Sequence, residues 1–451
     1  MTPHVGRRLT YDAVVVLPGV MGSELVDVDG KIQWGLKPAL LAGAWMSQKM
    51  DPLKVTEEDL AGGGRLRPTR LLRVPGYMPM LGGIEPYSAL LHRVAQHIAD
   101  PRAVLEFPYD WRLSIEYNAR ILAPWCEQRL AAWRELVAQH RWADPANVLV
   151  TIVAHSMGGL VARYATEVLG LSALVRQIIT LGTPYYGSVK AVSMMAAGEG
   201  APLPRRVARG LALTSPGVYD LLPRYRCVAP DRFLTTSDVV DVGGTAELAD
   251  EATDRWAALL LRPPDQGTVV ASAVPVQPLV GAEQPTLQGI RFIGGECLFD
   301  ESLAGLDYGG DSTVYRSAAA PAGMTAWPLP QKHGALAKTS EALTFVADKL
   351  IGADTGPPLG TRPVGADVPD LVQAGAPVEV TVTGADGDPV GVTVTSTDVS
   401  TNVPTPWTAV RRDGDLLRYT RPGLALGLHR IEIKAGGFSA VSELVLVADV
   451  T

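Results

Sequence analysis

The sequence is poor in cysteine, in aromatic residues and in long apolar runs, and these shortages exclude several classes of protein. Its 451 residues include only three cysteines, Cys126, Cys227 and Cys297. Their odd number and wide spacing exclude a disulfide-rich framework and match no metal-ligand pattern, so we expect a reducing compartment, no metal and no other cofactor. No apolar run approaches the roughly 18 residues of a membrane-spanning helix.

Positive charge is also scarce. The chain carries 40 Lys and Arg residues against 47 Asp and Glu residues, for a net charge of −7. Nucleic-acid binding usually needs a basic surface, so we expect no nucleic-acid partner. Arg7 and Arg8 are not followed by the hydrophobic segment of a signal peptide, which favours a cytoplasmic location, with export by another route left open.

The composition that remains is that of a globular enzyme with more than one domain. Apolar residues make up 47% of the chain and charged residues 19%. A chain of this length exceeds one ordinary core. The Pro- and Gly-rich residues 353–366 predict a linker between a catalytic domain, residues 1–352, and a smaller domain, residues 367–451.

Strand and helix patterns alternate through the first part of the chain. This alternation predicts a doubly wound, mostly parallel sheet, whose functional site lies at the carboxyl ends of the strands. The strands are expected at residues 11–17, 103–107, 148–153, 175–181, 289–294 and 324–328.

The stretch around Ser156 is the strongest signal in the sequence. A β-branched run over residues 148–153 leads into Ala-His-Ser-Met-Gly, and an apolar helical face follows. A strand, a serine between small residues and a helix form the nucleophile elbow of α/β-hydrolases. As a bare pattern it is expected by chance about once in two such chains, so its weight comes from this context.

A serine nucleophile needs a base and an acid that orients the base. Of the seven histidines, five lie on or near helices, in the N-terminal leader or in the C-terminal domain, and His155 lies inside the elbow and cannot easily turn onto Ser156, so His333 is the candidate base. Asp311, in a glycine turn, is the candidate acid, with Asp300 and Asp307 as competitors in the same segment. The order Ser156, Asp311, His333 is the order that α/β-hydrolases use.

Two backbone N–H groups are candidates for an oxyanion hole. One is that of Met157, directly after the serine, and the other is that of Val20, in the Gly-rich turn after the first strand. An ordinary β-turn is the competing interpretation of residues 18–23.

Two long segments interrupt the alternation. Residues 34–86 are irregular and rich in Trp, Met and Leu, which predicts a lid, with Trp34, Trp45 and Met46 as candidate contacts for an acyl chain. Residues 189–288 predict a cap insertion. The apolar residues of 34–86 could instead fill the core.

The C-terminal residues change to a period of two. Val378, Val380 and Val382 begin a series of short alternating strands, which predicts an immunoglobulin-like β-sandwich. This domain carries no residues that suggest chemistry, and its expected roles are to bind a protein partner or a surface, or to support the catalytic domain.

Six short motifs together resemble the lecithin:cholesterol acyltransferase-like family, which includes phospholipases A and phospholipid:diacylglycerol acyltransferases. The resemblance covers roughly residues 10–352. The motifs are residues 18–23 (PGVMGS), 108–112 (PYDWR), 154–159 (AHSMGG), 181–188 (LGTPYYGS), 310–314 (GDSTV) and 333–334 (HG).

The resemblance implies an α/β-hydrolase that acts on acyl esters of lipids through an acyl-serine intermediate, with peripheral contact to membranes or lipid aggregates. It also implies Ser156, Asp311 and His333 as a triad, and residues 109–112 as structural support. The chain departs from the secreted members because residues 34–86 contain no cysteine for a lid disulfide. An esterase or thioesterase for small soluble substrates, and a binding or effector scaffold, remain as alternative functions.

Overall fold

The structure is a computed structural model of the chain. It describes residues 9–35, 50–62, 64–73, 87–201, 203–259, 272–353, 364–369, 371–384, 391–401, 403–414, 416–435 and 440–448.

A central sheet of six parallel strands organises the first part of the chain, in the order β11-β8-β7-β6-β1-β5. Every residue of β1 and β6 is buried, which is typical of parallel strands covered on both faces. The strands are β1 (Ala13–Leu17), β5 (Val104–Glu106), β6 (Val150–His155), β7 (Val175–Leu181), β8 (Val276–Gly281) and β11 (Trp327–Leu329).

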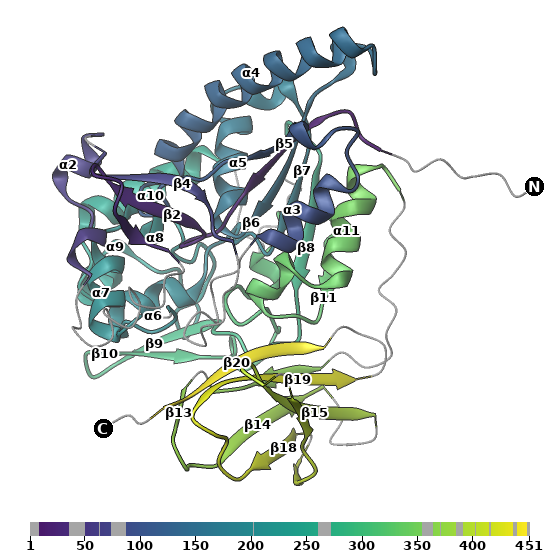
Figure 1. The fold of residues 1–451 in the computed structure, drawn as a ribbon. Coiled ribbons are helices and arrows are strands. Elements are labelled where there is room, and N and C mark those ends of the chain that lie inside the picture. The colour runs from purple at the N-terminus through teal and green to yellow at the C-terminus, as the bar shows by residue number, and fades with distance from the viewer. Residues whose placement is uncertain are drawn as a thin grey trace, which may run out of the picture.

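Two pairs of helices cover the sheet. Helix α4 (Ile115–His140) packs on α5 (Met157–Glu167), and α3 (Ser88–Ala95) packs on α11 (Ser340–Leu350). Figure 1 shows the two pairs on opposite faces of the sheet. The fold class predicted from the sequence, an α/β-hydrolase with a doubly wound parallel sheet, is confirmed by this arrangement.

The strand order reverses direction at β1. The chain runs from β1 outward to β5, then returns to β6 on the other side of β1. The loops after β1 and β6 therefore leave the sheet in opposite directions, which is where ligands bind in open α/β sheets. Ser156 lies at the end of β6, at this switch point.

Further elements surround this end of the sheet, as Figure 1 shows at its left. A three-stranded antiparallel sheet has the order β3-β2-β4, and β9 and β10 form a hairpin. These elements are β2 (Ser23–Asp27), β3 (Ile32–Trp34), α2 (Glu57–Leu60), β4 (Leu66–Leu71), α6 (Val189–Ala197), α7 (Arg205–Thr214), α8 (Pro216–Tyr219), α9 (Thr236–Asp241), α10 (Ala246–Ala258), β9 (Gly289–Ile293) and β10 (Glu296–Asp300).

The prediction of a core strand at residues 289–294 is wrong. Those residues form β9, which pairs with β10 and, at Ile290, with Val228, outside the central sheet. The core strand is β8, inside the range predicted for the cap insertion. Pro278 lies in the middle of β8, between β7 and β11, and proline in a central strand normally argues against a strand.

The C-terminal part is all-β, with two facing sheets of four and five strands. Alternate residues of β14 and β15 point into a separate apolar core that includes Val380, Val394 and Ile431. An all-β C-terminal part is thereby confirmed, while its immunoglobulin-like identity stays a prediction. The strands are β12 (Gly365–Asp367), β13 (Leu371–Gln373), β14 (Val378–Thr383), β15 (Val392–Asp398), β16 (Val403–Pro406), β17 (Val410–Asp413), β18 (Leu416–Arg421), β19 (Gly427–Ala435) and β20 (Val441–Ala448).

Within the residues that the structure describes, no helix combines the length and the apolar character needed to cross a membrane.

A buried ion pair joins helix α10 to the start of α4. Asp220 accepts hydrogen bonds from Arg255 Nε of α10 at 2.8 Å and from the Ile115 N–H at the start of α4 at 2.7 Å. Burial raises the pKa of Asp220 in spite of the neighbouring guanidinium, so the carboxylate depends on these partners.

We predict that Asp220→Ala lowers the free energy of unfolding by about 3–5 kcal/mol, because it removes the buried partner of Arg255 and leaves that guanidinium only the exposed Glu251. Asp300→Ala, which breaks the exposed pair with Arg291, is the control and should cost less than about 1 kcal/mol. Urea denaturation measures both, and equally small losses would contradict the prediction.

Candidate active site

Ser156 lies in a strained corner between β6 and α5. Its backbone has φ 51° and ψ −129°, a conformation that L-residues rarely adopt and that often marks functional sites. A hydrogen bond from the Ser156 N–H to the Leu181 carbonyl, 2.9 Å, fixes the corner to β7. At Gly158 an added Cβ would lie 2.5 Å from the Pro18 carbonyl oxygen, so the helix can start this close to β1 only without a side chain there.

The structure brings Ser156, His333 and Asp311 together. His333 Nε2 lies 2.8 Å from Ser156 Oγ, and His333 Nδ1 lies 2.8 Å from Asp311 Oδ2. A carboxylate can only accept, so Nδ1 carries the proton and Nε2 is free to accept the serine hydroxyl proton. Ser156 and His333 are each 7% exposed and Asp311 is fully buried.

The carboxylate of Asp311 is fixed in orientation by its own loop. Its Oδ1 accepts the N–H groups of Thr313 and Val314 at 3.0 and 2.7 Å, which leaves Oδ2 for His333. The Asp311 carbonyl also accepts the His333 N–H at 2.7 Å. Two separate contacts therefore join the loop of the acid to the loop of the base.

The two competing aspartates have other partners. Asp300 forms a two-point ion pair with Arg291, at 2.6 and 2.8 Å, and the hydrogen bond from that guanidinium lowers the pKa of Asp300. Asp307 accepts the side-chain amide of Gln288 and the N–H of Gly309. Of the three carboxylates, Asp311 is the one hydrogen-bonded to His333.

The two candidate oxyanion donors lie on the loops that meet at Ser156. Met157 is the first residue of α5, and the first N–H groups of a helix have no partner within the helix. Val20 follows Gly19, where an added Cβ would lie 2.8 Å from the Ser156 Cβ. The turn that holds Val20 is closed by a hydrogen bond from the Gly22 N–H to the Gly19 carbonyl, 3.0 Å.

Tyr87, which the sequence did not single out, links this turn to the base. Its hydroxyl accepts the Gly19 N–H at 2.8 Å and lies 2.9 Å from His155 Nδ1. His155 Nε2 lies 3.1 Å from the His333 carbonyl. Because a carbonyl can only accept, His155 is protonated at Nε2. In the neutral ring Nδ1 is then an acceptor, and Tyr87 donates its proton to it. The chain of hydrogen bonds has one possible direction.

This direction of the hydrogen bonds holds while His155 is neutral. Burial, and secondarily the neighbouring His333, lower the pKa of His155 from 6.5 to about 3. His155 therefore keeps one protonated and one accepting nitrogen across the ordinary pH range.

The candidate lid contacts have different outcomes. Trp34 is in β3, 1% exposed, where its indole N–H donates to the Met21 carbonyl at 2.8 Å and its ring packs edge-on against Trp111. It thus supports the turn after β1 from within the core. Trp45 and Met46 lie outside the described residues.

The motif of residues 109–112 forms a buried support below the same turn. The Tyr109 hydroxyl donates to the Pro18 carbonyl at 2.8 Å. Arg112, fully buried, donates to both oxygens of Asp110 at 2.9 and 2.7 Å and to the Leu53 carbonyl. These contacts agree with the structural role that the resemblance implies.

Metal-ligand clusters and reactive thiols were the other chemistry that the sequence could offer. Among them, no group of three or more His, Cys, Asp or Glu side chains is arranged to hold a metal ion. Burial raises the pKa of the Cys126 and Cys227 thiols to about 12, so both stay in the unreactive thiol form near neutral pH.

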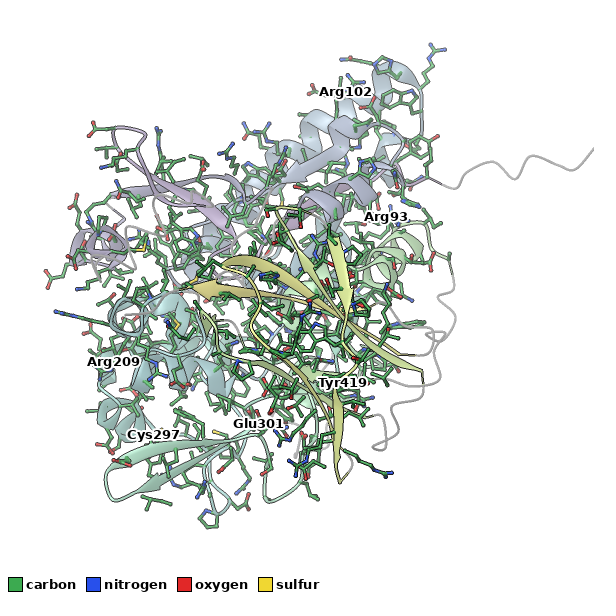
Figure 2. All side chains as sticks on the ribbon, turned by 60° about the horizontal axis from the view of Figure 1, so that its bottom comes forward. Arg93, Arg102, Arg209, Cys297, Glu301 and Tyr419 are labelled. Atoms are coloured by element: carbon green, nitrogen blue, oxygen red, sulfur yellow. The ribbon has the colours of Figure 1, made fainter. Side chains whose placement is uncertain are left out.

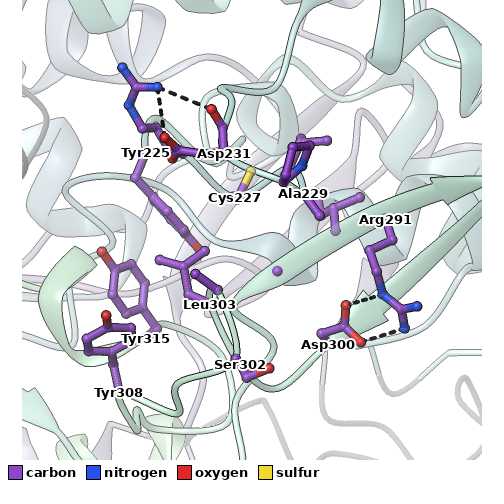
Figure 3. Close-up of a pocket in the computed structure, with 17 residues that line it drawn as sticks. Tyr225, Cys227, Ala229, Asp231, Arg291, Asp300, Ser302, Leu303, Tyr308 and Tyr315 are labelled. Carbon is purple, nitrogen blue, oxygen red and sulfur yellow. Dashed lines mark hydrogen bonds and ion pairs between the residues drawn. The ribbon is translucent and has the colours of Figure 1, made fainter.

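A cavity of about 390 Å³ lies between residues 225–231 and the hairpin β9–β10 (Figure 3). Tyr225 and Tyr315 pack against each other at its wall, with ring centres 4.5 Å apart, and Cys227 lies beside them. Ser156 and His333 do not line it, so the cavity is separate from the serine site.

The neutral state of His155 predicts a pH dependence of stability. Between pH 6.5 and pH 3 the unfolded chain binds a proton at this residue and the folded chain does not, so the free energy of unfolding falls as the pH falls through this window. We predict that His155 accounts for about 2 kcal/mol of the loss between pH 7 and pH 5.

Urea denaturation of the wild type and of His155→Gln at both pH values measures this contribution. The glutamine side chain does not titrate and keeps a donor and an acceptor, so the variant should lose correspondingly less stability. An identical pH dependence in the two proteins would contradict the assignment of a neutral His155.

Comparison with known proteins agrees with the fold. A family model described as lecithin:cholesterol acyltransferase matches residues 82–244, which include Ser156. A comparison with curated protein sequences finds no match.

Similar solved structures include a chain of the Tle4–Tli4 complex, with a TM-score of 0.51 and 17% identity, covering 76% of this chain and 99% of that chain. They also include the Bacillus licheniformis lipase BlEst2. Its mature form has a TM-score of 0.33 and 13% identity, over 77% of this chain and 94% of that chain. Its propeptide form has a TM-score of 0.35 and 15% identity, over 98% and 75%. The resemblance of this chain to the lecithin:cholesterol acyltransferase-like α/β-hydrolases is confirmed, and residues 82–244 carry the match.

Proposed function

We propose that the protein is a serine hydrolase or acyltransferase that acts on acyl esters of lipids through an acyl-Ser156 intermediate. The observation that carries the proposal is the hydrogen-bonded series Ser156 Oγ, His333 and Asp311 Oδ2, with 2.8 Å at each step, at a strained elbow. A serine hydroxyl is a weak nucleophile until such a base takes its proton.

In the first half of the reaction, Ser156 Oγ attacks the ester carbonyl carbon as its proton passes to His333 Nε2. The carbonyl oxygen becomes an oxyanion, for which the N–H groups of Val20 and Met157 are the proposed donors. Asp311 stabilises the imidazolium that forms. The tetrahedral intermediate then expels the alcohol, which takes the proton from His333 and leaves the acyl group on Ser156.

In the second half, His333 Nε2 takes a proton from water or from an alcohol acceptor, whose oxygen attacks the acyl-serine carbonyl. Collapse of the second tetrahedral intermediate returns the proton to Ser156 Oγ. Water as the acceptor gives a free fatty acid, and an alcohol gives a new ester.

The choice of lipid esters rests on the family match. The geometry supports the serine chemistry and carries no information on the acyl chain. A preference for small soluble esters, or a scaffold role without catalysis, are the competing outcomes of the two experiments that follow.

The first prediction concerns the nucleophile. A fluorophosphonate probe should label the wild-type protein, and labelling should disappear in Ser156→Ala, because only a base-activated serine reacts with such a probe. Ser400→Ala, at an exposed serine of the C-terminal part, is the control and should label like the wild type. A wild type that does not label would refute the proposal.

The second prediction concerns the acyl chain. With p-nitrophenyl esters of increasing length, kcat/KM should rise from acetate to chains of eight or more carbons and fall by at least about 10⁴-fold in Ser156→Ala. A preference for acetate would favour the small-substrate alternative.

The third prediction concerns Tyr87. Tyr87→Phe keeps the ring but leaves the Gly19 N–H and His155 Nδ1 without their partner, so the turn that carries Val20 should lose its position. We expect kcat to fall about 10–100-fold, with KM within about twofold of the wild type.

Tyr219→Phe is the matched control. The Tyr219 hydroxyl is also buried, also accepts a backbone N–H, from Thr245 at 3.0 Å, and also donates, to the Leu213 carbonyl at 3.1 Å, but it lies in the cap. The Tyr219→Phe variant should be less stable than the wild type and should keep its kcat. Equal effects on kcat in the two variants would contradict the proposal that Tyr87 positions the turn that carries Val20.

A further inference from the structure

The C-terminal β-strands contact the catalytic part on the side of the acid and the base. Figure 1 shows them below the sheet, and Figure 2, turned so that this side comes forward, shows them across the molecule with Glu301 close to them. Burial, together with the negative charges of Asp367 and Asp307, raises the pKa of Glu301, in agreement with close packing here.

The first contact is made by Gln284, which is 1% exposed and follows β8. Its side-chain amide donates to the Val364 carbonyl at 3.0 Å, and its amide oxygen accepts the Ala366 N–H at 3.2 Å. One side chain is thus hydrogen-bonded to the backbone on both sides of Gly365, at the start of β12. At Gly365, between them, an added Cβ would lie 1.9 Å from the Glu283 carbonyl oxygen, so the two backbones are in direct contact.

The backbone of Gln284 continues this contact to the acid. Its N–H donates to the Gly310 carbonyl at 3.0 Å, in a bridge that aligns Gln284 with Asp311. Its carbonyl accepts the Thr286 hydroxyl at 2.7 Å, and that hydroxyl accepts the Ser312 N–H at 2.9 Å. The residues on both sides of Asp311 are therefore hydrogen-bonded to the same segment that is hydrogen-bonded to β12.

The second contact is made by the residues directly before the base. Lys332 forms an ion pair with Glu443 of β20, with 3.5 Å between Nζ and Oε1 and side chains only 17% and 10% exposed. Gln331 donates its side-chain amide to the Ala440 carbonyl at 3.4 Å. Strand β20 and the residue before it thereby contact the two residues that precede His333.

We propose that the C-terminal β-part positions the acid and the base relative to each other, with Gln284 and Glu443 as positioning residues. It contacts the Asp311 loop through hydrogen bonds to Gln284, and the His333 loop through the ion pair with Lys332. This inference rests on the proposed function, since it concerns the same triad. A displacement of about 1 Å between catalytic groups can cost roughly 100-fold in rate, so we expect the loss of these contacts to lower kcat.

A purely structural attachment makes a different prediction. It would lower the unfolding temperature of a variant and leave kcat unchanged in protein that is still folded. The decisive readouts are therefore kcat and KM, measured well below the unfolding transition of each variant in the full-length chain.

The test exchanges the charges of the ion pair. Lys332→Glu and Glu443→Lys each place two like charges together, and we expect each to lower kcat for a p-nitrophenyl ester at least about 10-fold, with KM within about twofold. The double variant, with the pair restored in reverse, should recover most of the kcat. Such recovery reports the interaction itself, because the double variant carries both substitutions.

Gln284→Leu tests the other contact and should lower kcat in the same way, since leucine cannot bond Val364 and Ala366. Glu379→Gln, which breaks the exposed pair with Arg418 at 2.8 Å within the C-terminal part, is the control and should leave kcat unchanged.

The outcomes separate the two proposals. A wild type that neither labels with a fluorophosphonate nor hydrolyses the ester refutes the proposed function. A wild type that does both, with single variants that are folded and keep the wild-type kcat, refutes the positioning role and leaves the function intact. Loss of kcat in the single variants without recovery in the double variant also contradicts the proposed ion-pair contact.

Discussion

The close approach of two loops at one point of the sheet governs the rest of this structure. The turn after β1 and the corner after β6 meet where the strand order reverses, and Gly19 lies so near Ser156 that a Cβ there would be 2.8 Å from the serine Cβ. The positive φ of Ser156, the small residues around it and the start of α5 all follow from this contact. Strain of this kind persists only when the surrounding structure holds it in place.

Much of that surrounding structure is a polar network with a fixed direction. A neutral His155 must donate from Nε2 to the His333 carbonyl, and Tyr87 must therefore donate to Nδ1 while its oxygen accepts from Gly19. The turn after β1, the elbow and the loop of His333 are thus linked through buried hydrogen bonds, which are costly to break at one end only.

The sequence predicted the parts of this arrangement that depend on local chemistry. The strand, turn and helix around Ser156 are encoded by neighbouring residues, and Asp311 and His333 were found because a serine nucleophile needs those residue types in that chain order. Tyr87 could not be found in this way, because its role depends on contacts with Gly19 and His155, 68 residues away in each case. The position of β8 was missed because Pro278 contradicts the usual signal of a central strand, and β9 offered a more regular pattern. The contacts from Gln284 and Glu443 likewise join segments that are distant in the sequence, so local periodicity could not predict them.

The central claim is that Ser156 carries the acyl group during the reaction, and trapping that intermediate tests it most directly. The protein is mixed with a slowly hydrolysed long-chain p-nitrophenyl ester, quenched in acid within one turnover and digested for mass spectrometry. The account predicts that the peptide containing Ser156 gains the mass of the acyl group and loses it on longer incubation. An acyl group on another residue, or turnover with no acylated peptide at any time, would contradict it.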